Sequence, residues 1–71
     1  MSSANIIKVG NVLRYKKDED TNVAEGRVLR RAGKKGGKYD QWWNILNSET
    51  GQIYHVDFGK VNMLELLVSS F

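Results

Sequence analysis

Residues 39–58 read YDQWWNILNSETGQIYHVDF, and this stretch contains the clearest β-hairpin of the chain. Residues 39–47 and 52–58 are rich in aromatic and β-branched side chains, which are typical of strands. Between them, residues 47–51 (NSETG) have the composition of a tight turn. We therefore predict that two antiparallel strands pair across this turn.

Further segments with strand character lie on both sides of this hairpin. Residues 9–16 and 23–32 contain β-branched or aromatic residues, and the charged stretch KKDED at 16–20 between them is expected to be a solvated loop. The apolar spacing of residues 61–68 fits either one amphipathic helical turn or a final short strand. Five such segments, about a dozen residues apart, predict an all-β fold.

A small, strongly bent barrel is the all-β architecture that fits a chain of 71 residues. We predict a five-stranded SH3-like barrel, which closes its sheet on itself and so hides most strand edges. The barrel is expected to span residues 9–68, between a flexible N-terminal segment (1–8) and a C-terminal tail (69–71). A short helical turn near the C-terminus is compatible with this fold. The alternative is an α+β domain in which residues 61–68 form the helix.

The composition excludes several classes of protein. The chain contains no Cys, so disulfides, cysteine-based zinc sites and cysteine nucleophiles are excluded. Its 41% hydrophobic and 27% charged residues are typical of a folded domain rather than a disordered tail. Residues 66–68 form the longest apolar run, which is too short to cross a membrane, and residues 1–8 lack the features of a signal peptide. We therefore expect an intracellular location, with the nucleus as one candidate compartment.

The strongest candidates for catalysis are His55 and Asp57, which lie two positions apart on one face of a predicted strand. No activated nucleophile accompanies them, because Ser48 and Thr50 fall in a predicted turn and carry no motif. One His with scattered acids is a poor metal site, and the chain is too short to enclose a substrate pocket. We therefore predict a protein that is not an enzyme and has neither a metal site nor a cofactor.

Positive charge is concentrated in one part of the sequence. The net charge is only +3, yet residues 27–38 hold six cations and no acid. Within this segment lies a Gly/Lys loop, residues 32–38 (AGKKGGK), which lacks the Ser or Thr of a Walker motif and leads into a strand instead of a helix. Lysines on a pliant backbone can follow a phosphate backbone and release its counterions. Alternatively, the loop serves only to keep a small protein soluble.

Aromatic residues follow the Gly/Lys loop directly. Because adjacent strand residues point to opposite faces, Trp43 is expected beside Ile45 on one face and Trp42 on the other. The outer Trp either offers a stacking surface for bases or is covered by a loop or by the C-terminal segment. Basic residues next to exposed aromatics predict a nucleic-acid-binding surface of low sequence specificity. Its candidate residues are Arg27, Arg30, Arg31, Lys34, Lys35, Lys38, Tyr39 and Trp42.

Part of the chain resembles a stretch that recurs in retrotransposon polyproteins of animals. The resemblance is carried by RRAGKKGGKY at 30–39, WWNI at 42–45 and YHVDF at 54–58, and it covers roughly residues 9–67. It implies a small accessory barrel of a mobile-element polyprotein, comparable to the C-terminal DNA-binding barrel of retroviral integrases. The resemblance therefore favours DNA over RNA as the partner.

A second resemblance is to Tudor domains, at VDFGKV (56–61) followed by Leu64 and Leu66. Tudor barrels often carry a similar Asp-aromatic-Gly turn, and those that read methylated Lys or Arg need an aromatic cage with a nearby acid or Asn. The alternative function is therefore a Tudor-like or chromo-like module that binds a methylated peptide or another protein. A protein-assembly module within a larger complex is a third option. The candidate cage residues are Tyr15, Trp42 or Trp43, Tyr54, Phe58 and Asp57.

Overall fold

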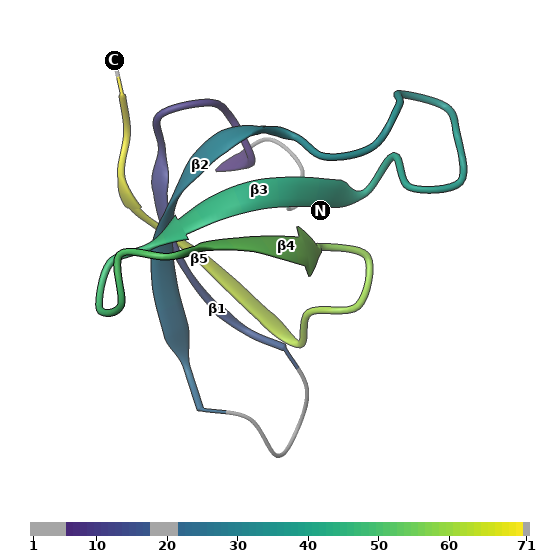
Figure 1. Ribbon diagram of the computed structural model, residues 1–71. Helices are drawn as coiled ribbons and strands as arrows, with labels where there is room; N and C mark the ends of the chain where they lie inside the picture. The colour runs from purple at the N-terminus through teal and green to yellow at the C-terminus, as the bar shows by residue number, and fades with distance from the viewer. Residues whose placement is uncertain (1–5, 18–21, 71) are drawn as a thin grey trace.

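The protein folds as five β-strands, seen in a computed structural model that describes residues 6–17 and 22–70 (Figure 1). The described residues contain no α-helix, so the all-β prediction is confirmed and the α+β alternative is wrong. The strands are β1 (Val12–Lys16), β2 (Ala24–Arg31), β3 (Trp42–Asn47), β4 (Ile53–Asp57) and β5 (Met63–Val68).

The strands form one sheet in the order β4-β3-β2-β1-β5, and every neighbouring pair is antiparallel. The first strand thus lies between the second and the last, and β4 and β5 are the two outermost strands. Figure 1 shows the sheet curling around a common interior. The prediction of a small five-stranded barrel is confirmed, and the ambiguous residues 61–68 supply the strand β5 rather than a helical turn.

The predicted hairpin is present as β3 and β4. Ile45 faces Tyr54 across the ladder, and Trp43 faces Val56. In the turn, the Asn47 side-chain oxygen accepts the backbone N–H groups of Glu49 and Thr50, at 2.8 and 2.9 Å. This Asx-type turn explains why the composition of residues 47–51 identified the hairpin so clearly.

The core lies on the inner face of the curled sheet. Leu13, Val28 and Ile45 are completely buried there, one from each of the three central strands. Trp43 packs partly buried against this core, whereas Trp42 lies on the outer face, so the predicted division of the two tryptophans is confirmed. The remaining buried apolar residues are Ile7, Tyr15, Val56 and Phe58.

Residues near both ends of the described chain are attached to the barrel. Ile7 belongs to the core although it precedes residue 9, where the barrel was expected to begin. The buried Asn11 donates from its side-chain nitrogen to the Ile6 carbonyl at 3.0 Å, and its side-chain oxygen accepts the Ser70 N–H at 3.0 Å. The barrel therefore extends over part of the predicted flanking segments. Residues 1–5, 18–21 and 71, which include most of the solvated loop predicted at 16–20, lie outside the described residues.

Ionisation of Tyr15 makes the stability of the barrel depend on pH in the alkaline range. Burial, together with the neighbouring Tyr54 hydroxyl, raises the pKa of Tyr15 above its ordinary value of 10.0. As the pH rises, the Tyr15 hydroxyl therefore loses its proton in the unfolded chain before it does so in the folded protein. The part of the free energy of unfolding that Tyr15 contributes is fully present below pH 10.0 and is lost as the pH rises through the higher pKa of the folded state.

We expect Tyr15→Phe to reduce the loss of stability at alkaline pH, because phenylalanine has no proton to release. Urea unfolding of both proteins at about pH 8 and about pH 11 measures this difference. Tyr39→Phe, at an exposed tyrosine, is the control and should keep the native pH dependence. Equal losses in Tyr15→Phe and the native protein would contradict the role given to Tyr15.

Candidate nucleic-acid interface

The outward-facing side chains of β2, β3 and β4 form rows across the barrel surface. The rows follow from the strand register, because inward-facing Val28, Ile45 and Val56 are buried and their neighbours face the other way. From one end of the strands to the other, the rows are Arg27–Leu46–Ile53, then Arg30–Asn44–His55, then Trp42–Asp57.

A β-bulge in β2 determines where the two adjacent arginines point. Val28 pairs with Ile45 and Arg30 with Asn44, so Leu29 is an extra residue in the ladder. Without the bulge, Arg30 would share the inward direction of Val28. The bulge instead places Arg30 on the outer face and Arg31 on the inner face, opposite Trp43.

Arg31 is therefore separated from the other predicted site residues. Its guanidinium carbon lies 4.6 Å from the centre of the Trp43 ring, a cation–π arrangement. The same guanidinium donates a hydrogen bond to the carbonyl oxygen of Asp40. Arg31 thus covers Trp43, and its hydrogen bond to Asp40 stabilises the connection between β2 and β3.

The Gly/Lys loop is a set of hydrogen-bonded turns. The Gly37 N–H donates to the Lys34 carbonyl at 2.9 Å, and the Trp42 N–H donates to the Tyr39 carbonyl at 3.0 Å. Gly36 has a φ of 80°, which favours glycine at the tip. A Cβ atom on Gly33 would overlap the Tyr39 carbonyl, so the two arms of the connection touch there. The loop therefore presents its lysines from a defined backbone.

Lys34, Lys35 and Lys38 are all exposed on this backbone. Within residues 6–17 and 22–70, the ion pairs are both made by Arg14, with Glu25 at 3.9 Å and Glu65 at 3.6 Å. None of the six cations between Arg27 and Lys38 is paired with a carboxylate of the described chain. The barrel therefore carries its charges unevenly, with a Glu–Arg–Glu row across β2, β1 and β5 and uncompensated cations around β2 and the Gly/Lys loop.

Two aromatic rings stand beside these cations. Tyr39 meets Trp42 edge-on, with 5.8 Å between the ring centres and 85° between the ring planes. The Lys38 ammonium lies 5.5 Å from the centre of the Tyr39 ring. Tyr39 is half exposed, and Trp42 is half-buried on the outer face, so this tryptophan is only partly covered.

The outer face is hollowed at two neighbouring places. The first hollow has a volume of 250 Å³ and is lined by Ala32, Tyr39, Trp42 and His55. The second has a volume of 340 Å³ and is lined by Leu29, Arg30, Asn44 and Ile53. Sequence reasoning missed Asn44 and His55 as members of this surface, although the register of the predicted hairpin places them side by side.

We use the name basic face for the exposed cations of β2 and the Gly/Lys loop together with four residues around the two outer hollows. Its members are Arg27, Arg30, Lys34, Lys35, Lys38, Tyr39, Trp42, Asn44 and His55. It contains every predicted site residue except Arg31.

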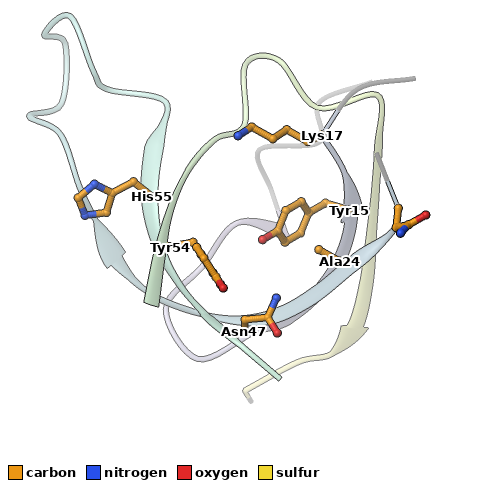
Figure 2. Close-up of a pocket in the computed structure, with 7 residues that line it drawn as sticks. Tyr15, Lys17, Ala24, Asn47, Tyr54 and His55 are labelled. Atoms are coloured by element: carbon orange, nitrogen blue, oxygen red, sulfur yellow. The ribbon is translucent and has the colours of Figure 1, made fainter. Parts of the chain in front are cut away.

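A third hollow, of 260 Å³, opens on the other side of the sheet (Figure 2). Tyr15 and Tyr54 point into it, whereas the ring of His55 points away. Two of the five candidate cage positions therefore meet here. Phe58 is buried in the core with its ring edge-on to Tyr15, and Trp42 and Asp57 lie in one row of the outer face. Binding of a methylated peptide stays a prediction.

The described part of the chain contains no group of residues placed to form a metal site and no helix that could span a membrane. No group of three or more His, Asp or Glu side chains is placed there to hold a metal ion. No helix in residues 6–17 or 22–70 is long and apolar enough to span a membrane. A scan of protein-family models, a search of curated proteins and a search of solved structures all find no match to this chain.

Proposed function

We propose that this protein is a nucleic-acid-binding module that binds DNA with low sequence specificity through the basic face. The observation that carries the proposal is the group of five cations, none of which is paired with a carboxylate of the described residues. Phosphates are the partners that such a group would neutralise, and the counterions released from the DNA would favour binding. These cations are Arg27, Arg30, Lys34, Lys35 and Lys38.

Low sequence specificity follows from the kind of contacts that the basic face offers. Lysine ammonium groups at an exposed loop contact phosphates, which are the same at every base pair. Reading base edges in the major groove requires a helix or a two-stranded ribbon that enters the groove. The Gly/Lys loop is neither, so we infer that it positions the module on the backbone without selecting a sequence.

The resemblance of residues 30–39, 42–45 and 54–58 to retrotransposon polyproteins supports a second part of the proposal. We propose that the module belongs to a mobile-element polyprotein, in which it holds nucleic acid while other parts perform the chemistry. The barrel fold suits this role because the connection between the paired strands β2 and β3 carries a basic loop next to an aromatic pair.

The test replaces Lys34, Lys35 and Lys38 with alanine together. Affinity should fall about equally for unrelated DNA sequences, because phosphate contacts are lost. The slope of log affinity against log salt concentration should flatten by about 0.9 for each lost contact, or roughly 2.7 if all three lysines touch DNA. Fluorescence anisotropy titrations at several salt concentrations measure both quantities. Stability should barely change, because the side chains are exposed.

A matched variant with Lys16, Lys17 and Lys60 replaced by alanine removes the same charge from outside the basic face. It should keep most of the native salt slope. If both triple variants flatten the slope equally, net charge alone attracts DNA and the basic face is not the site. If the loop variant binds like the native protein with the same slope, the Gly/Lys loop is only a solubility feature.

A further inference from the structure

We propose that the basic face binds single-stranded nucleic acid, with one unpaired base held in the hollow between Tyr39 and Trp42. This inference rests on the proposed function and adds the form of the ligand. It is carried by the shape of the two outer hollows, their spacing along the strands and the position of the cations around them.

The first hollow has the form of an aromatic corner. The Tyr39 and Trp42 rings meet at 85°, so one ring can lie against the face of a flat group while the other closes its side. Ala32 contributes only a methyl group, and His55 completes the lining. The volume of 250 Å³ is below the range of about 300–1,000 Å³ found for sites of drug-sized ligands. The hollow therefore suits one flat ring system rather than a base pair.

A recessed aromatic corner selects the unpaired form of a base. In a duplex the flat faces of the bases are covered by stacking, and only their edges are reached from the grooves. In a single strand the faces are accessible, and every base has one, so stacking on aromatic side chains tolerates any sequence. This agrees with the low sequence specificity proposed for the cations.

The second hollow extends the site by one nucleotide. It lies beyond the Arg30–Asn44–His55 row, between that row and the row of Ile53. Equivalent positions two residues apart on a strand are about 6.4–6.8 Å apart, whereas stacked nucleotides in a duplex rise about 3.4 Å. Adjacent stacked bases therefore cannot fill both hollows, but a strand with its bases spread apart can.

The polar groups around the hollows fit the rest of a nucleotide chain. Asn44 and His55 lie between the hollows and offer hydrogen bonds to base edges. Arg30 lines the second hollow, and the Lys38 ammonium lies 5.5 Å from the Tyr39 ring centre at the first. The backbone of a strand that places bases in both hollows would therefore meet a cation beside each base.

The experiment compares a labelled single-stranded DNA oligomer with the duplex of the same sequence by fluorescence anisotropy. The native protein should bind the single strand more tightly. Trp42→Ala should weaken single-strand binding by about 5- to 150-fold, as expected for loss of one stacked base. Duplex affinity should fall by a smaller factor than single-strand affinity, and the salt slope should stay native because no phosphate contact is removed. Trp42→Phe keeps an aromatic face and should restore most of the binding.

Tyr39→Ala is a second, independent test of the aromatic corner formed by Tyr39 and Trp42. Tyr39 is half exposed in a loop, so its removal leaves the core intact. It should also weaken single-strand binding selectively, including in the case that Trp42→Ala fails to fold. Equal affinity for single strand and duplex, unchanged by Tyr39→Ala, would overturn the inference while leaving the proposed function in place. Absence of binding to either DNA form would overturn both.

Discussion

Replacing Ile45 with alanine is expected to lower the free energy of unfolding by about 2–5 kcal/mol. Ile45 is completely buried in the middle of β3, where it faces Val28 on one side and Tyr54 on the other. Alanine would leave a cavity that three hydrogen-bonded strands cannot close. At about 0.05–0.15 kcal/mol per residue, a domain of 71 residues has roughly 4–11 kcal/mol in total. The loss is therefore a large part of the stability.

Urea unfolding monitored by tryptophan fluorescence measures this effect. Ile53→Ala is the matched control, since Ile53 is 59% exposed on the outer face of the neighbouring strand. It should change the free energy of unfolding by no more than about 0.5 kcal/mol. Similar losses from the two replacements would show that the core does not lie on the inner face of the sheet.

Replacing Gly26 with alanine is the second change expected to have a large effect. A Cβ atom at this position would overlap the Cγ2 of Ile45 and lie 2.7 Å from the carbonyl oxygen of Leu46. The side chain can rotate, but the carbonyl belongs to the β2–β3 ladder and cannot move without breaking it. We expect a loss of about 1–3 kcal/mol or more, as in other overpacked cores.

The midpoint of thermal unfolding should fall by about 4–8 °C for each kcal/mol that Gly26→Ala costs. Gly37→Ala in the Gly/Lys loop is the control. Its Cβ would make a tight contact of 3.1 Å with the Lys34 carbonyl oxygen, which an exposed loop can relieve by a small shift. Its midpoint should stay close to the native value. A Gly26→Ala protein as stable as the Gly37→Ala protein would mean that β2 and β3 do not approach as closely as the register requires.

The strands that the sequence predicted are those whose local pattern is sufficient to define them. In β3, the alternation of Trp42, Trp43 and Asn44 gave the correct faces, because side chains of a strand alternate whatever the strand packs against. Residues 61–68 were ambiguous because their apolar spacing fits both the period of a helix and the period of a strand. Pairing of Leu64 with Tyr15, far away in the chain, makes this segment a strand.

The candidate site could be predicted only in part, for a similar reason. The cations and aromatics of the basic face were visible in the sequence, but their directions depend on the bulge at Leu29. Nothing in the local pattern distinguishes a bulged β2 from a regular one. Adjacent strand residues point to opposite faces, but this rule does not show which of Arg30 and Arg31 joins the basic face and which covers Trp43.

The strand order also has a consequence for how the chain folds. The β2–β3 and β3–β4 ladders join segments that follow one another, whereas the β1–β5 ladder joins Val12 to Val68 and must close most of the chain into a loop. The entropy of that closure is lost before its contacts form, so folding is expected to be slow for a protein of this size. Until β5 docks, one edge of β1 lies open beside Leu13 and Tyr15. The interval before docking is therefore when chains of this protein are most prone to pair with one another and aggregate.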